Sequence, residues 1–393
     1  MRARSLPSKL FDKLSSSKLA LVMVLLLILF SIVGAVLPQQ GRMEFKDIAL
    51  WQMAHPTTTS MMRPLGFFHV FHSWPFIITI LILGVNTLTC TLLRFVKEGS
   101  FSSFKGPGSV RRMGFFSLHL SLILLFAGGF LTSTSRMKAR IVLTEGQSFE
   151  ERHDNYLQLV EGPLRSERHT GAKIRLKKVQ ITYEKKRYPV DVTSDLEFQS
   201  NKDTLVNGVI KVNYPFTYKG LAFTQDKTGF SPRLVIRDKK SKRVLFNSFI
   251  ALQTFDTPTG KVYRDFLSLP FLKQTYTVTV FPSFSINNGK VKKTGEDPEN
   301  PLLRIEMTDP IRQRSAQGNL PLGGRIVMEE YIFFFTELRR WSAFMVVQDP
   351  GYLPVCVALW LGLGALILRY VPDLKRWFVE KPGKGRHPGK RNP

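Results

Sequence analysis

Four apolar stretches constrain the fold of this chain more than any other feature of its sequence. Each is about 20 residues long and almost uncharged, which is the length of helix that spans a ~30 Å hydrocarbon core. A soluble enzyme or a cytosolic nucleic-acid-binding protein is therefore excluded as a description of the whole chain. We expect transmembrane helices over residues 19–37, 75–93, 113–132 and 352–371.

The first apolar stretch is expected to be a retained helix rather than a cleaved signal peptide. Its 19 residues exceed the ~7 to 15 apolar residues of a typical signal peptide. Leu37, Pro38 and Gln39 stand where a cleavage site of small residues would be needed.

The distribution of basic residues predicts the orientation of these helices. Five precede the first helix, five lie in the second loop and eight follow from Arg369 onward, whereas the first loop holds three. Short segments rich in Lys and Arg stay in the cytoplasm, while long domains are largely exempt from this rule. We expect segments 1–18, 94–112 and 372–393 to be cytoplasmic, and the loop 38–74 and the segment 133–351 to be extracytoplasmic. The net charge of +26 is then explained by the basic cytoplasmic segments, which are attracted to anionic lipid headgroups. We therefore expect no nucleic acid as a partner.

The long segment 133–351 has the pattern of a β domain. Apolar and polar residues alternate in runs such as 209–212 and 276–280, and this period of two is typical of strands with one buried face. Turn signals recur at 207–208 and 287–289. We predict an all-β domain of roughly a dozen strands, a sandwich or an open barrel. Residues 325–341 are compatible with a helix, although 326–335 suit a strand equally well.

His119 is the strongest candidate for a functional residue, because it is the one histidine within an expected membrane helix. An ionisable side chain is costly at that depth and usually faces a ligand, a partner or a cavity. Its position six residues after Met113 places it about 9 Å inside the cytoplasmic end of the helix. The alternative is a structural histidine that hydrogen bonds to Ser117, Ser121 or Asn86.

Two further histidines stand at the outer entrance of the second helix. The i, i+3 spacing of His69 and His72 would place both rings on one helical face. His72 is the weaker candidate for a haem or metal ligand, because a cluster of Trp, Phe and His at a membrane interface often only anchors the helix end. The remaining histidines lie in polar surroundings and are expected to be exposed. These are His55, His153, His169 and His387.

The sequence shows no pattern of a catalytic or thiol centre. Cys90 and Cys356 both lie in apolar stretches, one near the inner end and the other near the outer end, so we expect no disulfide between them. We also find no nucleophile and base pair, phosphate-binding loop or carboxylate pair. Intrinsic catalysis is therefore not expected.

Four stretches, taken in their order along the chain, resemble the ResB-type cytochrome c biogenesis proteins. The third, 212–225, is similar to the family signature V-N-x-P-L-x-x-x-G-x-x-F-Y-Q, although Phe216 and Thr224 replace its usual Leu and Tyr. Both are packing changes that leave the resemblance standing. The other stretches are 14–39, the helix that holds His119 with Gly128 and Gly129, and the D-P-G sequence at 349–351.

The resemblance implies a membrane subunit of a system II cytochrome c synthase in the bacterial cytoplasmic membrane. Haem b would be bound transiently while it is transported and presented for attachment to apocytochrome c. The implied partners are a CcsA/ResC-type membrane protein and apocytochrome c, and a thiol-reducing protein is left open as a third. By resemblance, His119 matches a membrane histidine that is an axial ligand of haem. The only metal expected at His119 is therefore the haem iron.

Haem chemistry leads to the same need for a partner. Haem iron takes axial ligands such as imidazole, often two of them, and this chain offers one histidine at membrane depth. A second imidazole would have to come from another subunit. Two alternatives remain open: a membrane anchor or receptor without haem, and a haem b redox subunit for quinone-linked electron transfer.

Overall fold

A computed structural model describes residues 11–379 except 12, 41–42, 44, 98–108, 166–168, 185–187, 201–204, 258–259, 288–289 and 310–312. His387 and the basic tail therefore lie outside the described residues. The chain divides into two compact units. Unit 1 comprises Met1–Met137, Val160–Ser166 and Asp349–Pro393, and unit 2 comprises Lys138–Leu159 and Glu167–Gln348.

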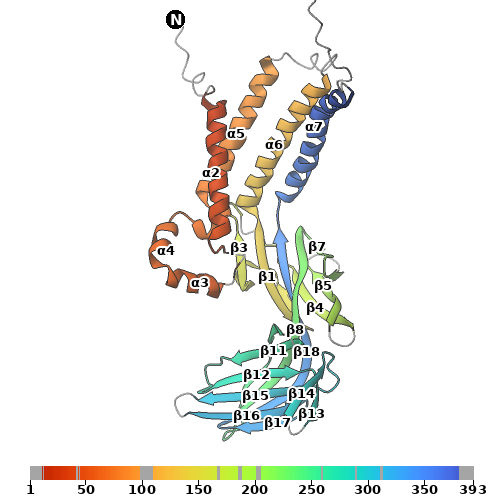
Figure 1. Ribbon diagram of the computed structural model, residues 1–393. Coiled ribbons are helices and arrows are strands. Elements are labelled where there is room, and N and C mark those ends of the chain that lie inside the picture. Colours follow the sequence, from red (N-terminus) through yellow and green to blue (C-terminus); the bar gives the residue numbers. More distant parts are fainter. Residues whose placement is uncertain are drawn as a thin grey trace, which may run out of the picture. The chain divides into compact units, whose positions relative to one another are not determined.

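Unit 1 contains four helices that are long and apolar enough to cross a membrane, as the sequence predicted (Figure 1). Their apolar spans are Ser17–Val36, Trp74–Val96, Ser109–Ser135 and Tyr352–Tyr370. The helices themselves are α2 (Ser17–Val36), α5 (Trp74–Lys97), α6 (Ser109–Ser135) and α7 (Tyr352–Val379).

Small residues bring these helices into close contact. A Cβ added to Gly128 of α6 would lie 2.7 Å from Val355 Cγ2 of α7, and one added to Gly114 would lie 2.8 Å from the Arg369 backbone nitrogen. Glycine lets two helix backbones approach to a distance that any side chain would prevent. Glycines of α6 therefore allow close contact with α7 near both ends of the two helices.

The loop 38–74 contains helical structure that the sequence analysis did not predict. It forms α3 (Phe45–Ala54), α4 (Pro56–Met62) and the 3₁₀ helix η1 (Phe67–His72). Gln39 is buried and joins η1 to the end of α2, because its Oε1 accepts a hydrogen bond from Val70 N at 3.0 Å and its Nε2 donates to Phe67 O at 2.9 Å. Pro56 stands at the start of α4, where the missing N–H costs nothing.

Unit 2 is built from antiparallel strands, which confirms the β-rich prediction. In the described residues the largest sheet has seven strands in the order β3-β1-β18-β8-β7, with β17 beside β18 and β9 beside β8. Their bounds are β1 (Met137–Thr144), β3 (Gln158–Glu161), β7 (Phe216–Tyr218), β8 (Leu221–Asp238), β9 (Val244–Phe249), β17 (Arg325–Met328) and β18 (Tyr331–Gln348).

Three smaller sheets complete the described strands. One contains β10 (Gln253–Thr257), β11 (Gly260–Leu267), β12 (Thr275–Phe281), β15 (Leu302–Asp309) and β16 (Arg314–Pro321). Another contains β2 (Ser148–Glu150), β4 (Lys173–Glu184), β5 (Tyr188–Gln199) and β6 (Val206–Lys211), and the third pairs β13 (Ser283–Asn287) with β14 (Lys290–Gly295). A short 3₁₀ helix, η3, spans His153–Asn155.

The two longest strands of the seven-stranded sheet are β8 and β18, which lie side by side. β8 and β18 have 18 residues each and pair antiparallel from Tyr331 opposite Asp238 to Val347 opposite Ala222. Residues 325–341, for which a helix and a strand were both open, therefore belong to β17 and β18. Bulges at Phe335/Glu337 and Ala343/Phe344 interrupt the pairing, and such bulges bend and twist a long strand.

The seven-stranded and five-stranded sheets share one apolar core, so this half of unit 2 is a β-sandwich. Phe333 and Phe335 of β18 are fully buried in the same cluster as Tyr276 of β12 and Ile305 of β15. Less buried residues stand between or beside them along each strand, which places them on the inner faces of the two sheets.

The signature stretch 212–225 contains β7 and the start of β8, together with the turns before and after β7. Asn213 has a φ of 66° and Gly220 one of 79°, a left-handed conformation that Asn and Gly tolerate best. At its end, Gln225 Oε1 accepts a hydrogen bond from Ser194 Oγ at 2.8 Å, and Gln225 Nε2 donates to Ser342 Oγ at 2.5 Å. The stretch therefore ends in a buried polar network, which explains its glutamine.

Candidate functional site

His119 lies half-buried on α6, one turn after Phe115. Its Nδ1 lies 2.9 Å from the carbonyl oxygen of Phe115, and the two ring centroids are 4.0 Å apart. Because a carbonyl oxygen only accepts, Nδ1 carries a proton, and in the neutral imidazole Nε2 then holds the lone pair. This is the tautomer and the backbone anchor that metal-binding histidines commonly have.

Two of the three side chains that could make His119 a structural histidine donate hydrogen bonds to backbone carbonyl oxygens. Asn86 Nδ2 donates to the carbonyl oxygens of Leu14 and Ser16 at 2.5 and 3.1 Å, and Ser121 Oγ donates to Leu118 O at 2.7 Å. In the described residues, His119 Nδ1 is bonded to the backbone of its own helix, and a structural histidine beside Ser117, Ser121 or Asn86 stays an alternative to the ligand role.

Aromatic and basic side chains surround the Ser109 end of α6 next to His119. Phe115 packs edge-on against Phe116 at 5.4 Å, and Phe116 packs against Phe95 of α5 at 5.6 Å. The guanidinium carbon of Arg94 lies 3.9 Å from the centre of the Phe115 ring, and that of Arg369 lies 5.7 Å from it. Helices α5, α6 and α7 thus all contribute to this environment.

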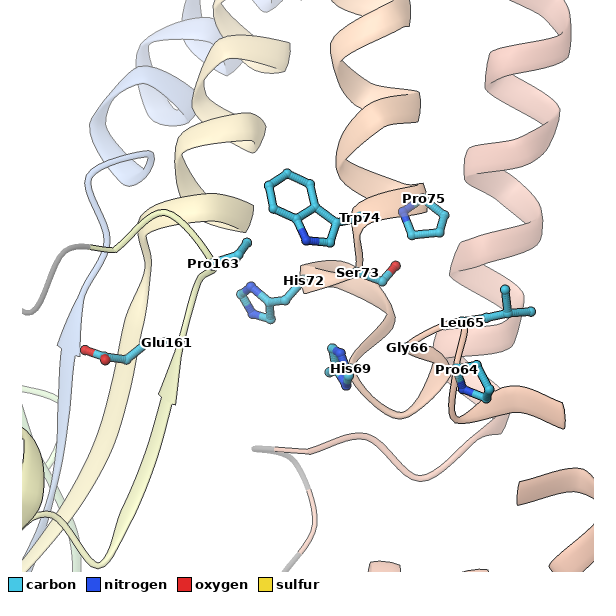
Figure 2. Close-up of a pocket in the computed structure, with 10 residues that line it drawn as sticks. All are labelled: Pro64, Leu65, Gly66, His69, His72, Ser73, Trp74, Pro75, Glu161 and Pro163. Carbon is cyan, nitrogen blue, oxygen red and sulfur yellow. The ribbon is translucent and has the colours of Figure 1, made fainter. Parts of the chain in front are cut away.

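A second candidate site is a pocket of about 300 Å³ within unit 1, at the start of α5 (Figure 2). Both His69 and His72 line it, together with Trp74 and three prolines. Figure 2 shows the two imidazoles in the same pocket, with Glu161 turned away from them. Glu161 instead forms an ion pair with Arg165 at 2.7 Å. The other lining residues are Pro64, Leu65, Gly66, Ser73, Pro75 and Pro163.

His72 is anchored in the same way as His119. Its Nδ1 lies 2.9 Å from the carbonyl oxygen of Ser133 near the end of α6, so Nδ1 is the donor of this hydrogen bond. Burial lowers the pKa of His69, and the nearby charge of His72 lowers that pKa further. The neutral form of His69 is therefore favoured, which suits a ligand nitrogen.

Unit 2 contains a third histidine arrangement, in which the predicted exposure of one histidine is wrong. His169 was expected to be exposed, but its side chain is only 8% exposed, and its Nδ1 lies 2.6 Å from Glu151 Oε1. Tyr156 and Thr170 also donate hydrogen bonds to this fully buried carboxylate. Burial alone would raise the pKa of Glu151, but the bonds from His169 and Thr170 outweigh it and hold that pKa below its usual range.

The other expectations about polar residues have simple outcomes. His55 and His153 are exposed as predicted. Cys90 Sγ lies 3.1 Å from Ser15 O, and both cysteines are free thiols. The pairing of His169 with Glu151 could not be found in the sequence, because the two residues are 18 positions apart in irregular segments without a recognisable motif.

Comparisons with known proteins point to one family. The model of the ResB-like family matches residues 17–98 and 96–387. The cytochrome c biogenesis protein Ccs1 of Thalassiosira pseudonana is 21% identical over 274 residues, which are 55% of this chain and 62% of that protein. The match thus spans less than two thirds of the relative. The solved structure of the cytochrome c haem lyase CcmF aligns with 87% of this chain and 38% of its own, at 13% identity and a TM-score of 0.30.

Proposed function

This chain belongs to the ResB-like family, and from that premise we propose that it is a haem-handling membrane subunit of a cytochrome c maturation complex. A role in cytochrome c maturation is supported by its similarity to Ccs1, a cytochrome c biogenesis protein. The finer proposal is that the chain binds haem in transit and helps to present it to apocytochrome c.

The observation that carries this proposal is the hydrogen bond between His119 Nδ1 and the backbone of α6. The His119 Nδ1–H is fixed to the Phe115 carbonyl oxygen, so in the neutral imidazole the Nε2 lone pair is available to an iron atom without any change of the ring. The aromatic residues beside it offer an apolar surface of the kind a porphyrin needs. Haem is the transported substrate here, and His119 would hold it through its iron.

A second axial ligand would come from a partner. His119 is the one histidine within the four apolar spans, and it lies on the surface of α6, half-exposed. We therefore assign the second imidazole to another membrane protein, a CcsA/ResC-type partner by resemblance. The bacterial cytoplasmic membrane, with both termini in the cytoplasm, is the proposed location.

His72, the last residue of η1, offers a second imidazole beside the other end of α6. Its anchor, Ser133, follows His119 by 14 residues on α6, which corresponds to about 21 Å along the helix axis. No single haem can bridge that distance between iron ligands. If His72 binds haem, it therefore does so at a separate position from His119.

The experiment that tests the proposal is His119→Ala in cells that produce a reporter cytochrome c. We expect holocytochrome to be lost and the Soret band of the purified complex to fall, while the amount of membrane-inserted protein is unchanged. His55→Ala is the matched control, because His55 is exposed and stacks on Trp51 at 4.4 Å. Normal maturation in His119→Ala at wild-type protein level would refute the ligand role.

The same spectra separate the two alternative functions. A membrane anchor or receptor would show no Soret band under any co-expression. A redox subunit for quinone-linked electron transfer would retain a stable, stoichiometric haem b. A haem-handling subunit would instead carry substoichiometric haem that depends on the co-expressed partner.

A further inference from the structure

Two arginines from different helices converge beside His119. The guanidinium carbons of Arg94 and Arg369 lie 3.9 and 5.7 Å from the centre of the Phe115 ring, and that centre is 4.0 Å from the centre of the His119 ring. Neither guanidinium carbon can therefore be farther than about 10 Å from the imidazole centre. Cations over an aromatic face are attracted by its quadrupole, which helps to hold them there.

Backbone packing fixes the position of Arg369. A Cβ on Gly114 would lie 2.8 Å from Arg369 N and 3.0 Å from Ala365 O, so α6 and α7 are in contact one residue before Phe115. On the other side, the edge contact between Phe95 and Phe116 links α5 to α6. The convergence is thus a consequence of how three helices pack.

The chemistry of this cluster indicates the class of ligand. An imidazole nitrogen binds iron, aromatic rings contact a flat apolar molecule, and guanidinium groups form paired hydrogen bonds with carboxylates. Haem has a partner for all three groups: an iron atom, a flat apolar macrocycle and two carboxylates. Both carboxylates extend from one edge of the macrocycle. Lipid phosphates would also attract arginines at a helix end, but they would not require an imidazole beside them.

We propose that Arg94 and Arg369 bind the two carboxylates of haem while His119 binds its iron. This inference rests on the proposed function and adds the residues that select the ligand and orient it. The carboxylate edge then faces the ends of α5 and α7, and the iron lies one helical turn deeper along α6.

The test compares haemin with its dimethyl ester, in which both carboxylates are blocked. The full chain is placed in nanodiscs of phosphatidylcholine, and each compound is titrated while the Soret band is followed. Wild-type protein should bind haemin about tenfold or more tightly than the ester, because charge-assisted bonds are lost with the ester. The double variant Arg94→Gln/Arg369→Gln should reduce this ratio to near one.

Matched variants make the result specific. Arg112→Gln removes the same charge from an exposed position near the start of α6 and should keep the wild-type ratio. Arg94→Lys/Arg369→Lys keeps the charges without the paired donors and should give an intermediate ratio. Thermal unfolding of each variant verifies that the helices remain packed.

One outcome would overturn the inference, namely a haemin-to-ester ratio in the double glutamine variant equal to that of the wild type. If the double variant also loses co-purifying anionic phospholipid, that result assigns the arginines to lipid. Failure of the proposed function is distinguishable, because His119→Ala would then leave the Soret band unchanged for both haemin and the ester.

Discussion

Gly351 of the D-P-G sequence lies directly against the carbonyl oxygen of Gly128 on α6, so close that a Cβ at position 351 would collide with it. Asp349 fixes this contact, because its Oδ1 accepts hydrogen bonds from Thr132 Oγ1 at 2.8 Å and from Gly351 N at 3.0 Å. Two stretches that are more than 200 residues apart in the sequence are thus two sides of one helix contact.

Gly351→Ala should therefore destabilise the packing of α7 on α6. We expect a loss of about 2 kcal/mol, because the added methyl group meets backbone atoms that cannot move independently. Thermal unfolding of the full chain in detergent measures this change. Gly129→Ala is the control, since a Cβ there meets nothing within 4 Å and alanine favours the helix by up to about 1 kcal/mol. Equal stability of the two variants would contradict the packing argument.

The features that the sequence predicted are those that depend on long, regular patterns. The four membrane helices follow from uninterrupted apolar stretches, and β8 and β12 follow from residues that alternate between two faces. The helices of the loop 38–74 could not be predicted, because η1 depends on a hydrogen-bonded connection from Gln39, about 30 residues earlier.

The candidate site was predicted as a single residue and not as an environment. His119 was chosen as a candidate because a histidine is costly within an apolar helix. The neighbouring Arg94 and Arg369 were counted only as cytoplasmic charges, since no local pattern connects three separate helices. Tertiary packing alone brings these residues to one aromatic ring.

The buried carboxylate of Glu151 should contribute to the stability of unit 2. Glu151→Gln keeps the size of the side chain but removes the charge that His169 and Thr170 bind, and we expect a loss of about 2 kcal/mol. Glu150→Gln is the matched control, because its partner Arg152 is 66% exposed. Thermal unfolding monitored by the β-sheet circular dichroism signal would show the difference.

The same carboxylate predicts how that stability depends on pH. Because the pKa of Glu151 is held below its usual range, the contribution is present above the unfolded pKa of about 4.3 and is lost as the pH falls through the folded value. The acid-induced loss of stability should be smaller in Glu151→Gln than in the wild type. An identical pH profile for both proteins would exclude Glu151 as its source.

His69 provides a test of the pocket at the start of α5. Its pKa is lowered by burial and by the nearby charge of His72, so His72→Gln should raise the pKa of His69 toward the ordinary value of about 6.5. Histidine ring signals in an NMR titration would report the change, with His55→Gln as the control. An unchanged pKa would mean that the two imidazoles do not interact.

The orientation of the chain can be tested with reporter fusions. Alkaline phosphatase is active only outside the cytoplasm, so a fusion at Gly260, at the start of β11, should be active. A fusion at Gly106, in the basic segment 94–112 and outside the described residues, should be inactive. The opposite pattern at either position would overturn the topology predicted from the basic residues.

The last prediction concerns the cavity left by removing the imidazole of His119. If Nε2 binds iron, free imidazole should partly restore holocytochrome formation in His119→Ala, because a small ligand can occupy a cavity of matching shape and bind the metal directly. His119→Gly, with a larger cavity, should respond at least as well, apart from a helix cost of about 1 kcal/mol relative to alanine. A histidine that only supports α6 predicts a different result. Added imidazole would then have no iron to bind, and the loss of activity would follow the loss of protein in membrane fractions quantified on immunoblots.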